Sequence, residues 1–258
     1  MSTALITGAS GGIGKAFAQE LAARNMNLVL VARSEEKLNQ LAAELQTKHN
    51  IKVDVIVRDL TESDATNAVF EYTQEKGLTI DLLINNAGFG DYGDFAERDG
   101  ERQVKIVQLN IVALVDLTHK YLPLMRDRRS GDIINVASIA GFQPIPYISV
   151  YAASKAFVLS FSQALWAENR SYNVRVLCSC PGPTETNFFI EAKFPTTIAA
   201  KNTQIATPQA VVRDALKALE KGESTVVSGG FATSMITGLS RFVPRQTLVS
   251  LLEKQFKN

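Results

Sequence analysis

The sequence has few of the residues that build metal centres or disulfide frameworks. Its 258 residues include two cysteines, Cys178 and Cys180, and two histidines, His49 and His119. The cysteines flank one residue of a predicted strand, where they share a face and are poorly placed to bridge. The histidines stand alone in predicted helices. We therefore expect buried core thiols and no metal site.

An excess of either charge is also absent. There are 27 basic and 26 acidic residues, which are interspersed and leave a net charge of +1. Nucleic-acid-binding chains typically carry a basic run or an arginine-rich arm, so we expect no nucleic-acid partner. No apolar run approaches the ~18 residues of a membrane span, and the stretch around Leu114 is interrupted by Asn110 and Asp116. The sequence therefore disfavours a membrane partner.

The N-terminus lacks the charged stretch and the long apolar stretch of a signal peptide. Met1 and Ser2 lead directly into an apolar strand that ends at Thr7. We expect a cytoplasmic protein in a reducing environment.

Short apolar strands alternate with amphipathic helices along the chain. Several strands are nearly continuous runs of Val, Ile and Leu, which is typical of strands buried on both faces of a parallel sheet. The pattern predicts an α/β fold over one domain, 1–258: a doubly wound, seven-stranded parallel sheet of Rossmann type with helices on both faces. The expected strands are Ala4–Thr7, Asn27–Ala32, Lys52–Val57, Leu82–Asn85, Asp132–Ala137, Val174–Cys178 and Thr225–Ser228, and the expected helices are Ile13–Arg24, Glu35–Lys48, Glu62–Lys76, Glu101–Arg126, Ser149–Arg170 and Pro208–Lys221.

Two segments near the C-terminus stand outside this alternation. Residues 183–207 form a long irregular segment after the sixth strand, which predicts a substrate loop. Residues 231–258 form a tail with a helix start at Pro244 and Arg245. Its apolar stripe can dock on its own subunit near the substrate loop, on a neighbouring subunit or on a membrane surface; the stripe comprises Leu248, Val249, Leu252 and Phe256.

A glycine-rich turn joins the first strand to the first helix. It reads Thr7-Gly8-Ala9-Ser10-Gly11-Gly12-Ile13-Gly14. Glycines let the backbone turn tightly and approach a pyrophosphate, while the helix N-terminus supplies free N–H groups. A turn of this composition at this place predicts dinucleotide binding.

The glycine spacing, Thr-Gly-x-x-x-Gly-x-Gly, resembles the short-chain dehydrogenase/reductase family. Further family motifs follow in order, including Asn85-Asn86-Ala87-Gly88 and Tyr151-x-x-x-Lys155. The resemblance implies an oxidoreductase that uses NAD(P)(H). The cofactor contacts it implies are Gly8, Ser10, Gly12, Ile13, Gly14, Asp59, Leu60, Asn86, Ala87, Gly88, Tyr151, Lys155, Pro181, Gly182, Thr184 and Thr186.

Tyr151 and Lys155 suit the proton transfer that accompanies carbonyl reduction. Hydride transfer to a ketone creates an alkoxide, which needs a proton from a nearby general acid. At positions i and i+4 of a helix the two side chains share a face. An ammonium ~4 Å from the phenol, at an effective dielectric of ~20, would lower its pKa by about three units. We therefore expect Tyr151 to be a general acid with a lowered pKa.

Two further residues complete the predicted catalytic set. The Ser138 hydroxyl can hold the substrate oxygen. The family resemblance implies that Asn110 anchors a water that links Lys155 to solvent, and that Lys155 also holds the nicotinamide ribose hydroxyls.

The end of the second strand indicates the choice of cofactor. Enzymes that select NAD place an acidic residue there, which repels a 2′-phosphate. This chain has Ala32, Arg33 and Ser34 instead. The planar fork of Arg33 suits a phosphate, so we expect NADP(H). The alternative is that Arg33 stacks on the adenine, which would suit either cofactor.

Aromatic and apolar residues follow several strands at the edge where ligands bind in open sheets. They predict a largely apolar ketone, aldehyde or alcohol as the substrate. The absence of the common Asp-Gly-Gly turn after the seventh strand makes the chain resemble members with a helical tail, including bacterial relatives of hydroxysteroid dehydrogenases. The apolar candidates are Phe89, Tyr92, Phe142, Tyr147, Phe188, Phe189, Ile190 and Phe194.

The resemblance also implies a homo-oligomer, dimer or tetramer, formed through the helices around Asn110 and Lys155. Two other functions remain as alternatives. A non-catalytic NADP(H)-binding sensor or scaffold would share the glycine turn and Arg33, but it would not need the four catalytic side chains. A nucleotide-sugar epimerase or dehydratase can use Tyr-x-x-x-Lys, but such proteins are longer and carry an added substrate domain.

Overall fold

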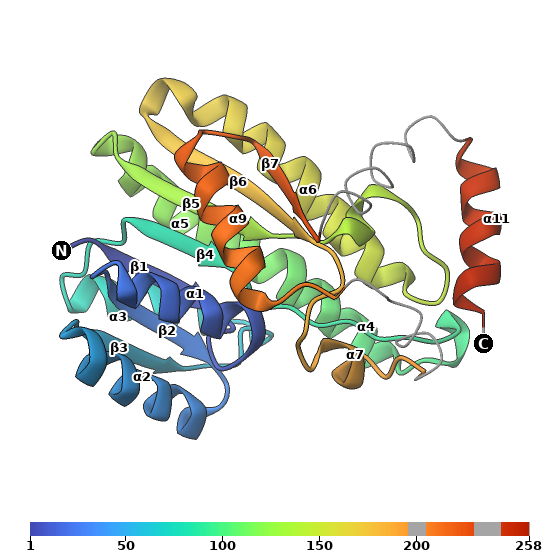
Figure 1. Ribbon diagram of the computed structural model, residues 1–258, viewed down its shortest axis with the longest axis horizontal. Helices are drawn as coiled ribbons and strands as arrows, with labels where there is room; N and C mark the ends of the chain where they lie inside the picture. The colour runs from blue at the N-terminus through green and yellow to red at the C-terminus, as the bar shows by residue number, and fades with distance from the viewer. Residues whose placement is uncertain (196–204, 230–243, 258) are drawn as a thin grey trace.

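The computed structural model describes residues 1–195, 205–229 and 244–257. Within these residues the centre is a seven-stranded, wholly parallel sheet of order β3-β2-β1-β4-β5-β6-β7 (Figure 1). This confirms the predicted α/β fold of Rossmann type. The strands are β1 (Thr3–Thr7), β2 (Asn27–Ala32), β3 (Val53–Val57), β4 (Leu82–Asn85), β5 (Gly131–Val136), β6 (Val174–Pro181) and β7 (Thr225–Ser228).

Helices cover both faces of this sheet. Successive residues of β2 divide between the two layers: Leu28 and Leu30 pack in one core cluster, and Val29 and Val31 in the other. Burying such side chains contributes about 1.5–3 kcal/mol each, which explains why the strands are continuous apolar runs. The helices are α1 (Gly12–Ala23), α2 (Glu35–His49), α3 (Ala65–Glu75), α4 (Gly100–Val107), α5 (Leu114–Asp127), α6 (Ser149–Asn169), α7 (Phe188–Glu191), α9 (Pro208–Glu220) and α11 (Arg245–Phe256).

Two predicted helices differ from the observed ones. The helix expected over Glu101–Arg126 is divided by a π-helical turn over Gln108–Ala113. The helix expected from Glu62 begins at Ala65, because the Thr61 hydroxyl donates to Asp59 and does not cap the helix. Strand β6 also continues to Pro181, beyond the expected end at Cys178.

The strand order reverses direction between β1 and β4, and the loops after these two strands therefore diverge. Ligands of open α/β sheets bind in the crevice at such a point. In Figure 1, α7 and α11 lie at this end of the sheet. This end of the molecule is thus assembled from segments far apart in the sequence.

The C-terminal helix α11 packs on its own chain. Leu252 is buried, and Leu248 and Phe256 pack in the same cluster as Tyr92 and Phe194. Of the three docking places left open by the sequence, the structure shows the one beside the substrate loop. Residues 196–204 of that loop, and residues 231–243 and Asn258 of the predicted tail, lie outside the described residues.

In the part of the chain that the structure describes, no helix combines the length and apolarity required to cross a membrane.

Candidate active site

The glycine turn between β1 and α1 is locked to the loop after β4. The side-chain amide of Asn86 donates to the Thr7 carbonyl (2.9 Å), and the Thr7 hydroxyl accepts from the backbone of Asn86 and Ala87 (3.0 Å each). A Cβ on Gly14 would collide with the Gly8 carbonyl oxygen, so only glycine allows this close packing. Gly14 lies beneath the turn and not in the cleft wall, unlike the other predicted cofactor positions. Glycine is needed at this position because a side chain would clash with the turn.

A cleft of about 1400 Å³ runs from this turn to α11. It brings together nearly all of the predicted cofactor positions, and Ser138, Tyr151 and Lys155 lie in its wall. The backbone turns at one end and the apolar side chains at the other are suited to a nucleotide and an apolar substrate, respectively. The predicted cofactor positions in the wall are Gly8, Ser10, Gly12, Ile13, Arg33, Asp59, Leu60, Asn86, Ala87, Gly88, Tyr151, Lys155, Pro181, Gly182, Thr184 and Thr186.

The end of the cleft beside β2 and β3 is more basic than the sequence analysis predicted. Arg33 has a side chain that is 75% exposed, and its Nη1 lies 3.7 Å from Asp59 Oδ2. Lys15, Lys37 and Arg58 line the same end. They follow β1, β2 and β3, so their positions at the carboxyl edge of the sheet were the signal that could have identified them.

Asp59 stays ionised among these cations. Burial raises the pKa of its carboxyl, but the hydrogen bonds from Thr61 and the charge of Arg33 outweigh burial and hold the pKa below its usual value. Four basic side chains thus line this end of the cleft, and Asp59 is the carboxylate beside Arg33, so positive charge is in excess there.

Tyr151 lies in the first turn of α6, at the wall of the cleft. Desolvation raises the pKa of Tyr151 to about 12, and the hydrogen bond with Ser138 lowers it only in part. The predicted lowering was therefore wrong in direction. Lys155 Nζ is 5.8 Å from the Tyr151 ring centroid and donates to the Val136 carbonyl at 2.8 Å, so the ammonium does not offset the desolvation. The phenol is neutral at pH 7, which is the form that donates a proton.

Lys155 is buried under the cleft. Desolvation lowers the pKa of its ammonium to about 8, and the nearby thiols of Cys178 and Cys180 raise it in part. Both cysteines are free and buried, with their Sγ atoms 3.6 Å apart. Lys155 thus titrates close to neutral pH, unlike an exposed lysine.

Asn110 lies in the π-helical turn, behind the cleft wall. Its amide nitrogen donates to the Phe89 carbonyl (3.1 Å) and the Ser154 hydroxyl (3.0 Å), and its oxygen accepts from the Phe89 N–H (3.1 Å). A Cβ on Gly88 would lie 2.9 Å from Asn110 Oδ1 and 3.4 Å from Lys155 Nζ. The polar groups of Asn110 and Lys155 therefore lie near one another beside Gly88, and the relay water stays a prediction.

The substrate end of the cleft is largely apolar. Phe89, Phe188, Phe189 and Phe194 lie in its wall as predicted. The Phe188 ring packs against the Tyr151 ring with a centroid distance of 5.0 Å. The Tyr151 phenol is therefore covered by an aromatic side chain of the loop that follows β6.

Four of the predicted apolar residues lie outside the cleft wall, and other apolar residues of the wall were missed. Ile190 is 79% exposed, Phe142 packs beside the buried cysteines, and Tyr92 and Tyr147 pack with α11. The wall instead includes Ile145, Ile148, Leu252 and Phe256. The apolar stripe of the tail was the signal for the last two, but the sequence did not indicate where it docks.

Comparison with known proteins gives the family. Residues 2–194 match the family model described as short chain dehydrogenase. The chain belongs to the short-chain dehydrogenase family. It is accordingly an oxidoreductase that acts on CH–OH groups with NAD(P)(H), which excludes the non-catalytic alternative.

Relatives of this short-chain dehydrogenase span nearly its whole length. A very-long-chain 3-oxoacyl-CoA reductase from Anas platyrhynchos is 33% identical, over 98% of this chain and 80% of the relative. A 17-beta-hydroxysteroid dehydrogenase type 3 from Rattus norvegicus is also 33% identical, with the same two shares covered. The structure of a short-chain dehydrogenase from Sphingobium yanoikuyae in complex with NADPH superposes with a TM-score of 0.85 at 32% identity, and covers 97% of this chain and 96% of that one.

The buried ammonium of Lys155 predicts a pH dependence of stability. Its pKa falls from 10.5 in the unfolded chain to about 8 in the native state, so between these values the unfolded chain binds a proton that the native state does not. The contribution of Lys155 therefore makes the native state more stable as the pH rises from 8 to 10.5. Lys155→Met should lose this rise, measured as the difference between the urea midpoints of variant and wild type from pH 7 to 10.5. Parallel pH profiles would contradict the shift.

Proposed function

We propose that this short-chain dehydrogenase interconverts a carbonyl and an alcohol on a largely apolar small molecule, with NADP(H) as its cofactor. The observation that carries the proposal is the placement of Tyr151. Its phenol lies at the cleft wall between the hydroxyl of Ser138 and the ring of Phe188. It stays protonated at neutral pH and can protonate a developing alkoxide.

Each side chain has a separate role in this proposal. NADPH supplies the hydride when it is bound. Ser138 orients the substrate oxygen, and Tyr151 donates its proton to that oxygen in reduction and accepts it in oxidation. Lys155 holds the ribose hydroxyls, and Asn110 supports the relay water. Phe188 covers Tyr151 and adds an apolar ring to the wall that receives the substrate.

The basic end of the cleft supports NADP(H). A 2′-phosphate adds negative charge beside the adenosine ribose, and Arg33 offers it a planar set of donors. Lys15, Lys37 and Arg58 line the same end and add to the positive field there. The similar enzyme from Sphingobium yanoikuyae was solved in complex with NADPH.

The substrate class follows from the apolar end of the cleft. Aromatic rings of the substrate loop and side chains of α11 form this end, so an apolar body gains more from binding here than a polar one. The names of the two relatives also indicate substrates with large apolar parts, a very long acyl chain and a steroid.

Tyr151→Phe should lower turnover by about 10²–10⁴-fold, because it removes the general acid but keeps the ring that packs on Phe188. The measurement is NADPH absorbance with a panel that contains a long-chain 3-oxoacyl thioester, a 17-ketosteroid, an aryl ketone and a polar keto sugar. NADPH binding, followed by fluorescence, should be unchanged. Retention of more than about a tenth of the turnover would contradict the role of Tyr151, and a preference for the keto sugar would contradict the substrate class.

Arg33→Ala should weaken the binding of NADPH and leave that of NADH nearly unchanged. Loss of a charge-assisted contact costs about 1.5–3 kcal/mol, or roughly tenfold to a hundredfold in Kd. Titration of both cofactors into both proteins measures the effect. Equal losses for the two cofactors would show that Arg33 stacks on the adenine, and a wild type that prefers NADH would reject the assignment.

We also propose a homo-oligomer formed through the helices around Asn110 and Lys155. Val104, Val112 and Phe157 lie on these helices and are 59%, 47% and 42% exposed. Phe157→Glu should then shift the mass, measured by sedimentation, from a multiple of 28.1 kDa toward the monomer. Phe95→Glu is the control, because Phe95 is 62% exposed but lies in the turn before α4. A wild-type monomer would refute the proposal.

A further inference from the structure

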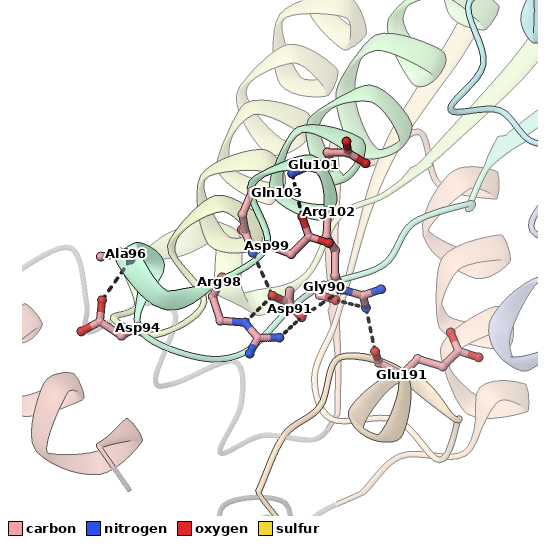
Figure 2. Close-up of polar contacts among 10 residues, drawn as sticks. All are labelled: Gly90, Asp91, Asp94, Ala96, Arg98, Asp99, Glu101, Arg102, Gln103 and Glu191. Atoms are coloured by element: carbon pink, nitrogen blue, oxygen red, sulfur yellow. Dashed lines mark hydrogen bonds and ion pairs between the residues drawn. The ribbon is translucent and has the colours of Figure 1, made fainter.

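A buried carboxylate lies behind the site, in the loop that follows β4 (Figure 2). The Asp91 side chain is fully buried, and each of its oxygens accepts two hydrogen bonds. Oδ2 accepts from Arg98 Nε (2.7 Å) and Gln103 Nε2 (2.8 Å), and Oδ1 accepts from Arg98 Nη2 (2.8 Å) and Arg102 Nε (2.9 Å). Burial raises the pKa of Asp91, but these contacts outweigh it and hold the pKa below its usual value. Asp91 is therefore an ionised and fully satisfied anchor.

The two arginines bound to Asp91 differ in what else they contact. The hydrogen bonds of the Arg98 side chain go to Asp91. Arg102 Nη2 donates to the Gly90 carbonyl (3.1 Å) and to the Glu191 carbonyl (2.7 Å), and the Arg102 guanidinium lies 5.0 Å from the Phe89 ring centroid. Figure 2 shows Arg102 between the loop of Asp91 and the segment of Glu191. One guanidinium thus joins α4, the loop after β4 and the end of α7.

This contact is made at the place where α7 needs a partner. Glu191 is the last residue of α7, a helix of four residues. The carbonyls of residues 188–190 accept from the N–H groups of residues 192–194, whereas the Glu191 carbonyl accepts from Arg102. So short a helix does not hold its own conformation, and a cation at its C-terminal end is favourable. A second bond, from the Tyr92 N–H to the Ala192 carbonyl (2.8 Å), joins the same two segments. The end of α7 is therefore fixed by the loop after β4 and by Arg102.

The other end of α7 covers the phenol. Phe188 is its first residue and packs on Tyr151. A Cβ on Gly90 would lie 3.0 Å from Phe188 Cζ and 3.3 Å from Tyr151 Cδ2. Gly90, whose carbonyl binds Arg102, thus also lies beside both rings. A shift of Arg102 would be transmitted to Phe188 through α7 and past Gly90.

We propose that Arg102 is a positioning residue for the reaction. Asp91 holds the guanidinium, and the guanidinium fixes α7 so that Phe188 covers Tyr151 before the substrate binds. This inference rests on the proposed function for its catalytic consequence, but the placement of α7 by Arg102 can be measured without a substrate.

Arg102→Gln and Arg98→Gln form a matched pair for the test. In either variant Asp91 keeps one arginine and Gln103. Arg98 makes two of the hydrogen bonds to Asp91 and Arg102 makes one, so a role limited to holding Asp91 predicts the larger loss of thermal stability and of loop order in Arg98→Gln. A positioning role predicts that Arg102→Gln has the larger effect on the order of α7 and on KM.

Hydrogen–deuterium exchange of the full chain tests whether Arg102 holds α7 in place. In Arg102→Gln the amides of residues 188–194 should exchange about tenfold faster, as expected for the loss of one charge-assisted bond. In Arg98→Gln they should exchange as in wild type. Equal acceleration in the two variants, or none in either, would overturn the proposal.

Kinetics with NADPH and benzil, an apolar diketone, test the catalytic consequence. Arg102→Gln should raise KM about tenfold while kcat stays within about threefold, because the cover is lost but Tyr151 is intact. Arg98→Gln should leave both constants unchanged. An unchanged KM in Arg102→Gln would overturn the positioning role. A wild type that reduces no apolar ketone would instead count against the proposed substrate class, while exchange would still decide the placement of α7.

Discussion

The hydrogen bonds between Thr7 and the loop after β4 are the constraint on which the site depends. They hold together the two loops that diverge where the strand order reverses. The Thr7 hydroxyl accepts from the N–H groups of Asn86 and Ala87, and the Thr7 carbonyl accepts from the Asn86 side chain. Divergence opens the crevice, and the hydrogen bonds keep its floor rigid. The glycine turn presents its backbone on one side of this floor. On the other side, the loop after β4 passes beside Tyr151 at Gly90 and reaches Asp91, which binds Arg102.

Desolvation is the second determinant of the chemistry, and it acts on Tyr151 and Lys155 together. It raises the pKa of the phenol to about 12 and lowers that of the ammonium to about 8, because it disfavours the charged form of each group. Both groups are thus mostly uncharged between about pH 8 and about pH 12. A neutral phenol is the proton donor that reduction needs, while an ammonium that titrates near pH 8 can exchange protons without a large cost in free energy.

Much of the site could be predicted from the sequence, because its residues belong to short motifs whose spacing is local. The glycine turn, Asn86 to Gly88 and the Tyr151–Lys155 pair each occupy one loop or one helical turn, and the structure brings them to one cleft. The features that were missed depend on contacts between distant segments. Leu252 enters the wall only because α11 packs beside Phe194. The direction of the Tyr151 pKa was wrong because a pairwise Coulomb estimate omits desolvation, which depends on everything packed around the ring.

The two ends of the cleft differ in how they are held, and this difference bears on substrate choice. The nucleotide end is built from turns that are bonded to the sheet itself. The substrate end is built from α7 and α11, which are held by a few non-local contacts such as those of Arg102 to Glu191 and of Tyr92 to the Ala192 backbone. A change in such a contact can move a wall of the cleft without disturbing the sheet or the catalytic side chains. Relatives with the same identity to this chain can therefore carry the names of different substrates, an acyl-CoA and a hydroxysteroid, while family membership still defines the class of reaction.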